Sequence, residues 1–418
     1  MDNAKITARF RHYDTLVIGA SQAGLAAGYY LKRAGLRFAL LDAADEIGAA
    51  WSSRWDSLRL FTPARYDALP GMPFPGEPYS LPTKDDVAAY LKAYAQRFDL
   101  PVRLRTSVRS LRVEDARYVV TAASGESFTA RSVIVATGAN QQPYVPAFAG
   151  GLHPRLVQMH SSAYRRPSQL PEGGVLVVGA GNSGAQIALE LAQSGRKVVL
   201  SGPDTGSMPR RFLGRDIYDW LWPTIMRPPV DTAVGRRLMQ GRLFAGDPLI
   251  GLSAKSLARP GLARVGKTIG VRRGAPVLAD GRVLSGVGAV IWCTGFRPDF
   301  SWIELPVLGV DGYPLHRRGI ASGAPGLAFL GMRFQHRMSS ALLGGVGEDA
   351  AYVSGEIVKF LKSNRLAHPA SSISIRKVSD KPALPDDVRW SARLPETLLS
   401  HPRSNRRLRI RAPTSPLR

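Results

Sequence analysis

A glycine-rich turn that occurs twice constrains the fold of this chain more than any other sequence feature. Each copy begins with a short apolar run, continues with a GxGxxG-like turn and a helical pattern, and closes much later with an apolar strand that ends in Thr-Gly. The turns span 19–24 and 179–184, and the closing strands span 132–138 and 289–295. Self-similarity of this kind is the signature of repeated structural units. Two such units in one chain predict two dinucleotide-binding sites.

The three glycines of such a turn have separate tasks. The first permits the tight turn, the second lets the backbone approach a pyrophosphate, and the third lets the helix pack on the strand. The pyrophosphate then lies at the positive end of the helix dipole. The second turn is complete, whereas the first carries Ser21 at the middle position, and a strand–turn–helix without a ligand is its alternative interpretation. The predicted binding residues are Gly19, Ser21 and Gly24 for the first nucleotide, and Gly179, Gly181, Asn182, Ser183 and Gly184 for the second.

The residues that end the second strand of each unit suggest which nucleotide binds where. Asp42 follows the first turn at roughly the 20-residue spacing of an acid that accepts ribose hydroxyls, with a helix N-cap as the alternative role. The corresponding strand of the second unit ends at Ser201, so no acid repels a 2′-phosphate there. Arg210 and Arg211 follow, and their forked donors suit a phosphate unless they are ordinary surface charges. The sequence therefore favours NADPH over NADH in the second unit.

The order of the remaining patterns predicts an α/β fold in which one unit is inserted into the other. Hairpin patterns at 117–133 and 277–290 precede the closing strands, and a strand at 326–331 and a helix at 344–361 follow the second unit. We expect a discontinuous FAD-binding domain (13–150 and 296–365) and an NAD(P)H-binding domain (171–295) joined by a linker (151–170). A basic tail, 366–418, is rich in proline and arginine, and we expect it to be poorly ordered.

Composition excludes several function classes. Cys293 is the single cysteine, which excludes a CxxC redox pair and a cysteine-rich metal site, and we expect no metal. No apolar run reaches the roughly 18 residues of a membrane span, and the N-terminal residues do not resemble a secretory signal, so we expect a cytoplasmic protein. The net charge of +24 comes without a recognisable nucleic-acid-binding module, so we expect no nucleic-acid partner. A homodimer is left open.

Several short motifs together resemble class B flavin-dependent monooxygenases, especially the YUCCA-like and related bacterial flavoproteins. The resemblance covers roughly 13–361 and is carried by the segments 48–51, 55–62, 72–75, 85–94, 136–138, 294–299 and 346–350. It implies two Rossmann-like domains that bind FAD and NADPH, with a small organic substrate and O2 as partners. It also implies FAD contacts from Trp51, Thr137, Gly138 and Asp349, and NADPH contacts from Thr294 and Gly295.

Two departures from the family pattern concern the linker and the reaction site. His160 and Tyr164 match the second half of the family's identifying linker motif, but the Phe-Gly half is displaced upstream, and His160 could equally satisfy a backbone group. Phe61 stands where relatives carry an asparagine near the flavin, and a phenyl ring cannot donate a hydrogen bond. The candidate catalytic residues are therefore Phe61, Thr62 and Asn140, with backbone groups or a nicotinamide ribose as further donors.

The reaction implied by the resemblance is hydride transfer from NADPH to FAD, oxygen activation as a C4a-(hydro)peroxyflavin, and transfer of one oxygen atom to a small organic substrate. Two alternatives remain at this stage. One is an NAD(P)H oxidase or reductase that releases peroxide or passes electrons on, and the other is a non-catalytic nucleotide-sensing flavoprotein linked to transport. The sequence does not specify the substrate. Trp220, Trp222 and Met226 in the variable segment 201–270 are either pocket residues or core.

Overall fold

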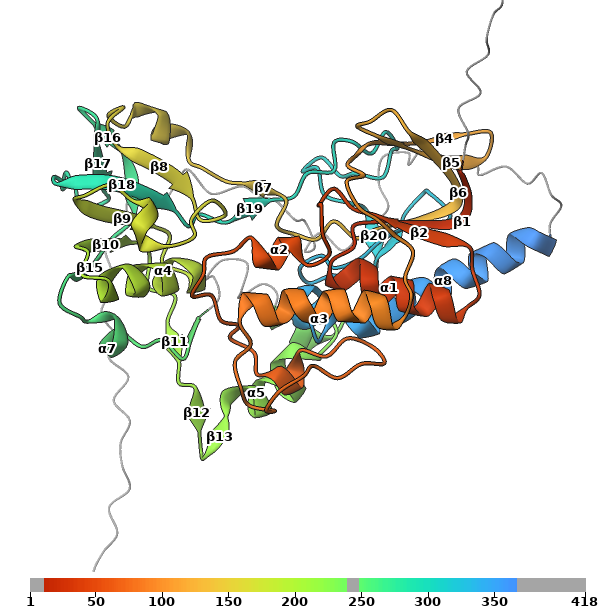
Figure 1. Ribbon diagram of the computed structural model, residues 1–418, viewed down its shortest axis with the longest axis horizontal. Helices are drawn as coiled ribbons and strands as arrows, with labels where there is room; N and C mark the ends of the chain where they lie inside the picture. The colour runs from red at the N-terminus through yellow and green to blue at the C-terminus, as the bar shows by residue number, and fades with distance from the viewer. Residues whose placement is uncertain (1–10, 239–247, 367–418) are drawn as a thin grey trace, which may run out of the picture.

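The computed structural model describes residues 11–238 and 248–366, and it contains two α/β units joined through the short strands β7 (Gln142–Pro143) and β19 (Phe296–Arg297) (Figure 1). The expected fold class is confirmed. The basic tail, which we expected to be poorly ordered, lies outside the described part of the chain from residue 367 onward. Among the described residues, no helix combines the length and apolar character that a bilayer crossing requires.

The first unit is built on a mixed sheet whose centre is parallel. Its strand order is β20-β21-β22-β6-β1-β2-β3, and the antiparallel strands β4 and β5 extend from β6. The strands are β1 (Arg11–Ile18), β2 (Phe38–Leu41), β3 (Val102–Arg103), β4 (Val108–Glu114), β5 (Arg117–Ala122), β6 (Ser127–Val135), β20 (His316–Arg317), β21 (Ile320–Ala321) and β22 (Leu327–Phe329). Because β22 pairs with β6, the first unit is completed only after the chain has passed through the second.

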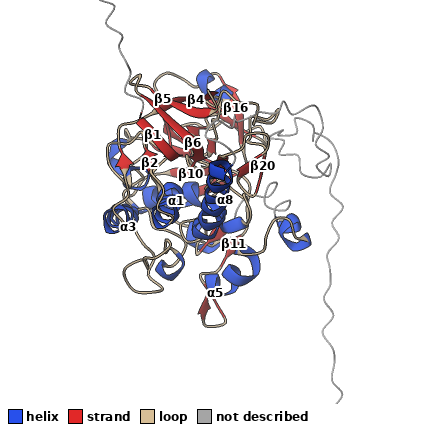
Figure 2. Ribbon diagram, turned by 90° about the vertical axis from the view of Figure 1, so that its right-hand side faces the viewer, coloured by secondary structure: helices blue, strands red, loops and turns tan. Residues whose placement is uncertain are grey.

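Both faces of this sheet are covered, which explains the uninterrupted apolar sequence of its central strands. Val17 and Leu40 belong to the core on the helical face, and Leu16 and Leu41 belong to the core on the opposite face, next to the β4–β5 hairpin. Figures 1 and 2 show the helices gathered below the sheet. They are α1 (Gln22–Arg33), α3 (Lys84–Arg97) and α8 (Val346–Leu366), with the short α2 (Ala49–Ser52) above them.

The second unit has a wholly parallel sheet of order β15-β10-β9-β18-β8. Its strands are β8 (Val157–His160), β9 (Gly174–Val178), β10 (Val198–Ser201), β15 (Leu262–Val265) and β18 (Val287–Trp292), and its main helix is α4 (Asn182–Gln193). Within 151–170, which we expected to be a linker, Val157–His160 forms an edge strand because its backbone pairs with β18. A strand of four residues is too short to be predicted from an alternating pattern of apolar and polar residues.

One of the two predicted hairpins was placed incorrectly. In the first unit β5 and β6 pair antiparallel around Gly125, as predicted. In the second unit the hairpin is β16 (Thr268–Arg272) with β17 (Ala275–Leu278), and it turns at Gly274. The predicted turn at Gly281 is closed by an isolated bridge. Both turns contain a glycine next to apolar residues, so the sequence signal does not distinguish them.

Part of the variable segment leaves the second unit and packs on the first. Its short elements are β11 (Ser207–Met208), β12 (Arg211–Phe212), β13 (Arg215–Asp216), α5 (Ile217–Leu221), the π-helix η4 (Trp222–Met226), β14 (Leu249–Ile250) and α7 (Ala254–Leu257). Tyr66 of the first unit stacks on Trp222 with ring centroids 4.9 Å apart, and its hydroxyl donates a hydrogen bond to Asp219 over 2.6 Å. Met226 and Trp222 thus take part in a packed cluster between the units.

Candidate active site

The first glycine turn forms a phosphate cradle between β1 and α1. Gly19 has φ +105°, which favours glycine, and a Cβ at Gly24 would lie 1.9 Å from the carbonyl oxygen of Gly19. Ser21 is the N-cap of α1, but its hydroxyl donates to Gln22 Oε1 over 2.7 Å and makes no capping bond to the backbone. The side chain of Ser21 therefore leaves the helix N-terminus to an anion, which is what a pyrophosphate site requires.

Asp42 lies against this cradle, as its predicted role demands. Its Oδ2 accepts a hydrogen bond from the Ala20 backbone N–H over 2.5 Å, and its Oδ1 accepts one from the Ala44 N–H over 2.9 Å. The bond to Ala44 closes a local turn and caps no helix, because the next helix begins only at Ala49. Each carboxylate oxygen has a second lone pair, so ribose hydroxyls remain acceptable donors. Trp51, the next predicted FAD contact, donates to Gln22 Oε1 over 3.3 Å and so lies beside the same turn.

The second cradle repeats this geometry with more open space. Gly179 has φ +108°, and a Cβ at Gly184 would lie 1.8 Å from the carbonyl oxygen of Gly179. By contrast, a Cβ at Gly181 would have no atom within 4 Å, so the backbone is open at the position that must approach a pyrophosphate. Ser183 is exposed at the start of α4. Asn182 is engaged with the segment that follows the undescribed residues, because its side chain bonds Pro248 O and the Ile250 N–H, each over 3.2 Å.

The structure gives Ser201 and Arg210 contacts other than those we predicted for them. Ser201 is fully buried, and its hydroxyl bonds Gly266 O and the Thr268 hydroxyl. Arg210 pairs with Asp216 over 2.7 Å and donates to the Phe61 carbonyl over 2.6 Å. Both side chains therefore have partners within the chain, and their roles toward NADPH stay predictions. Arg211 is exposed, and its role as a phosphate ligand stays a proposal.

Asp349, at the start of α8, is a buried carboxylate without a donor. Its side chain is 0% exposed, and neither carboxylate oxygen has a hydrogen-bond partner. Burial raises the pKa of Asp349, opposed by the nearby Ser340 hydroxyl and Arg337 guanidinium. A buried polar group without a partner is costly and calls for an explanation. Hydroxyl donors from a bound ribityl chain supply one, so this residue fits the predicted FAD site.

The strand-end motifs of the two units meet at the connector. Gln141 donates to Thr137 Oγ1 over 2.9 Å and to Gly138 O over 2.8 Å, while its Oε1 accepts from the Asp299 N–H over 2.8 Å. On the other side, Thr294 donates its hydroxyl proton to Tyr144 O, and the Tyr144 N–H donates to Gly295 O over 3.0 Å. The carboxyl ends of β6 and β18, where ligands bind in such sheets, are thereby held to one paired segment.

The linker motif residues have structural partners. His160 is buried, its Nε2 bonds Gly295 O over 2.9 Å, and its Nδ1 bonds Ser162 over 2.9 Å. Burial lowers the pKa of His160, which favours the neutral ring. Tyr164 donates its hydroxyl proton to Glu190 of α4 over 2.7 Å. Of the two roles considered for His160, the contacts match the one in which it satisfies a backbone group.

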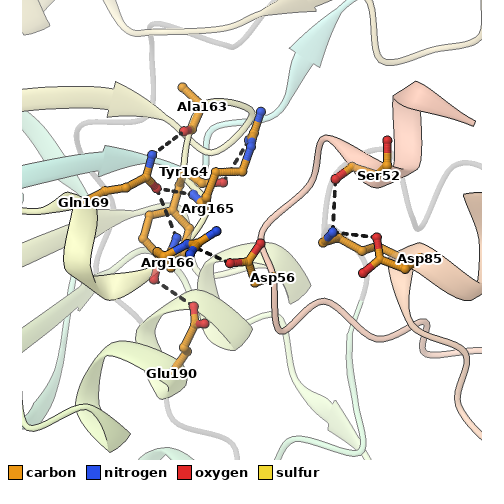
Figure 3. A network of polar contacts seen from close by, with 10 residues as sticks. Ser52, Asp56, Asp85, Ala163, Tyr164, Arg165, Arg166, Gln169 and Glu190 are labelled. Atoms are coloured by element: carbon orange, nitrogen blue, oxygen red, sulfur yellow. Dashed lines mark hydrogen bonds and ion pairs between the residues drawn. The ribbon is translucent and has the colours of Figure 1, made fainter. Parts of the chain in front are cut away.

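A polar network holds this linker against the first unit (Figure 3). The Asp56 carboxylate forms an ion pair with Arg166 over 2.8 Å. The backbone N–H of Asp56 also donates a hydrogen bond to Arg165 O over 2.8 Å. In the same view Gln169 and Glu190 tie the linker to itself and to α4. The two cradles are therefore fixed relative to each other by side chains from both units.

The three predicted catalytic candidates lie in different surroundings. Asn140 is exposed near the connector. Phe61 stacks on Tyr218 with ring centroids 6.4 Å apart and so closes the packed cluster between the units. Thr62 is buried and donates its hydroxyl proton to Asp67 over 2.6 Å. Burial raises the pKa of Asp67 to about 7.

Sequence reasoning missed Asp67 and Gln141. Asp67 follows Thr62 through a short 3-10 turn, η1 (Ala64–Tyr66), and no sequence pattern predicts such a turn or the burial of its carboxylate. Gln141 bridges residues more than 150 positions apart, which only the tertiary fold reveals. A polar residue three positions after the Thr-Gly motif was the one available signal. Among the described residues, no group of three or more metal-ligating side chains is assembled.

Comparison with known proteins agrees with this geometry. The profile of the pyridine nucleotide-disulphide oxidoreductase family matches residues 16–228, which is half of the chain. The chain belongs to this family. It is 44% identical over 349 residues to an uncharacterized CzcO-like oxidoreductase of Geobacillus kaustophilus, covering 82% of this chain and 98% of that protein. It is 35% identical over 207 residues to the indole-3-pyruvate monooxygenase YUCCA1 of Oryza sativa, covering 49% and 51%.

A solved structure gives the same result. The flavin-containing monooxygenase from Stenotrophomonas maltophilia superimposes with a TM-score of 0.68 at 30% identity, covering 84% of this chain and 99% of that one. Together these comparisons confirm the resemblance to class B flavin monooxygenases. They show that the chain is a flavin-dependent oxidoreductase. They also support the expected cofactors, FAD and NADPH.

Proposed function

We propose that this chain is an FAD- and NADPH-dependent monooxygenase. Per turnover it would consume one NADPH, one O2 and one proton, and return NADP⁺, water and a small organic product that has gained one oxygen atom. The observation that carries the proposal is the pair of open cradles on two sheets whose strand ends are held to one connector. This arrangement suits two dinucleotides that must meet at their redox-active ends.

The residues of this chain would hold the cofactors in two sets. Gly19, Ser21, Gly24 and Asp42 would hold the adenosine diphosphate half of FAD, and Asp349 its ribityl chain. Gly181, Ser183 and Arg211 would hold NADPH. When bound, FAD supplies two-electron chemistry that amino-acid side chains cannot supply. The protein orients the cofactors and excludes water from the site. The stacked Phe61 and Tyr218 would exclude water between the units, since an apolar contact offers water no partner.

Thr62 and Asp67 would be the proton-holding pair of the site. With a pKa of about 7, Asp67 is close to half protonated at neutral pH, and its Oδ1 is in direct contact with the Thr62 hydroxyl. The net reaction takes up a proton, and a group whose pKa lies near the working pH is well matched to that task. Their proposed role is to retain or release a proton at the Thr62 hydroxyl.

An NAD(P)H oxidase is the second candidate, because Phe61 offers no hydrogen-bond donor where relatives carry an asparagine. The two can be separated by counting products. Purified, flavin-loaded protein would be given NADPH in air with a panel of amines, thioethers and ketones, while NADPH loss, peroxide release and oxygenated product are measured. A monooxygenase yields product and little peroxide with at least one substrate class. One peroxide per NADPH throughout the panel would establish the oxidase, and FAD binding without turnover would contradict both.

A further inference from the structure

A β-hairpin formed by β12 and β13 projects from the lower edge of the molecule (Figures 1 and 2). Its strands pair antiparallel through Arg211 with Asp216 and Phe212 with Arg215. The two residues at the tip are Leu213 and Gly214. The proposed reaction uses Arg211 at the base of this hairpin, but neither the reaction nor the fold accounts for its apolar tip.

The tip of the hairpin is apolar and exposed. Leu213 is 74% exposed and Phe212 is 52% exposed, and Trp220 of the adjoining α5 is 38% exposed. The ring of Trp220 meets that of Phe212 edge-on at 6.4 Å, and Leu213 follows Phe212 directly in the chain, so the three exposed residues lie together at the tip. Contiguous exposed apolar groups of this kind mark interaction sites more often than single exposed residues do.

The backbone at the tip makes the leucine more unusual. Leu213 has φ +49° and Gly214 has φ +76°, the pattern of a two-residue turn that normally carries asparagine, aspartate or glycine. A leucine there is strained as well as exposed, and the folded chain gains no packing from it. Strain and exposure at one residue point to a contact that the isolated chain does not contain.

The charge around the patch is positive. Arg211 and Arg215 are exposed on the two strands, and the Arg215 guanidinium lies 5.9 Å from the centre of the Trp220 ring. The nearest acids are paired with other groups: Asp216 binds Arg210, and Asp219 accepts from Tyr66. The full sequence has a net charge of +24, so its long-range field has the same sign as the patch.

The hairpin is also held rigidly at its base. Arg210 bonds both Asp216 and the Phe61 carbonyl, and the Ile217 N–H donates to Arg210 O over 2.9 Å. The Trp220 indole donates to Phe212 O over 3.2 Å. These contacts present the tip in one orientation and lower the entropy that a binding partner would have to remove.

We propose that this hairpin is a docking site for the surface of an anionic lipid bilayer. Phe212 and Leu213 would enter the interface between headgroups and acyl chains, Trp220 would lie at headgroup level, and Arg215 would pair with lipid phosphates. An apolar tip with an aromatic girdle and flanking arginines has the composition that interfacial anchors share. The contact would hold the enzyme at a surface where apolar substrates concentrate.

The test is co-sedimentation of the full, flavin-loaded chain with vesicles of phosphatidylcholine containing phosphatidylglycerol, and with vesicles of phosphatidylcholine alone. The hairpin variant is Phe212→Ser with Leu213→Ser, and the matched control is Val310→Ser, which removes a fully exposed apolar side chain elsewhere. We expect the hairpin variant to partition at least about tenfold less onto anionic vesicles than the wild type, with the control unchanged. Binding of the wild type should be weaker on neutral vesicles and in high salt.

The basic residues after 366 are identical in all three proteins, so their attraction to the vesicles cancels in the comparison. Equal partitioning of the wild type and the hairpin variant would overturn the proposal. So would a wild type that ignores vesicles but forms dimers that the two serines abolish, measured by light scattering. NADPH oxidation in solution, followed in parallel, should be the same for all three proteins. If the wild type itself does not oxidise NADPH, that result would contradict the proposed reaction and would leave the docking site untouched.

Discussion

The hydroxyl of Thr62 donates a hydrogen bond to Asp67 over 2.6 Å, and both side chains are buried. The second carboxylate oxygen of Asp67 has no partner, and one guanidinium nitrogen of the neighbouring Arg210 has none either. Burial outweighs the Thr62 hydrogen bond and the Arg210 charge, so the pKa of Asp67 rises to about 7. The candidate site thus contains a carboxyl group that is protonated below neutral pH.

Asp67→Asn should make stability less dependent on pH. Because the folded pKa of Asp67 lies above its ordinary value of 3.8, the folded state binds more protons than the unfolded state between pH 4 and 7. Wild-type stability should therefore fall as pH rises through this range, by up to about 4 kcal/mol. The variant should match the wild type near pH 4 and exceed its urea midpoint at pH 8. Asp45→Asn, at an exposed position, is the control, and parallel curves for wild type and Asp67→Asn would contradict the assignment.

Gly181→Val should block the second nucleotide without disturbing the fold. A Cβ there has no neighbour within 4 Å, so the side chain meets nothing until a pyrophosphate arrives. We expect the Kd for NADPH to rise more than about tenfold, since displacing a phosphate from a helix N-terminus removes charge-assisted hydrogen bonds. FAD content and melting temperature should stay unchanged. Gly150→Val, at another open position, serves as the control, and unchanged NADPH affinity in Gly181→Val would remove the second cradle from the site.

Asp349→Ala should have opposite effects on flavin binding and on the stability of the flavin-free chain. The buried carboxylate has no hydrogen-bond partner, so its removal should raise the melting temperature of the apoprotein. If the ribityl hydroxyls are its natural donors, the same change should weaken FAD binding about tenfold or more. The ratio of flavin to protein absorbance after dialysis measures the second effect. A variant that keeps its flavin through dialysis as the wild type does would show that Asp349 is not a flavin ligand.

Arg210 and Arg211 should differ sharply although they are adjacent. Arg211→Met should lower the preference for NADPH over NADH, measured as the ratio of the two KM values, because an exposed guanidinium is available to a 2′-phosphate. Arg210→Met should leave that ratio alone and instead destabilise the chain by roughly 3 kcal/mol, since the buried Asp216 carboxylate loses its cation and keeps only the Tyr218 N–H as a partner. Thermal denaturation and the KM ratio would be measured for both. An altered ratio in Arg210→Met alone would reverse the two assignments.

The sequence by itself determined the two glycine turns, the strands and helices beside them, and the acid that follows the first. Each turn is local: Gly19 and Gly24 meet within one strand–turn–helix, so the pattern of a few neighbouring residues fixes the contact. The same holds for the predicted position of Asp42, whose carboxylate bonds Ala20 at the edge of the cradle. Local chemistry was enough to predict the cradles and the fold class.

Only the tertiary structure decided which of the predicted ligand-binding side chains bond to other residues of the chain. Ser201 bonds Thr268, which is distant in sequence but lies in the same unit. Arg210 bonds Phe61 because the variable segment packs on the first unit. Such partners are distant in sequence, and the free energy of their pairing depends on burial that no local pattern encodes. The raised pKa of Asp67, the unpaired carboxylate oxygens of Asp349 and the exposed leucine at the hairpin tip have the same origin.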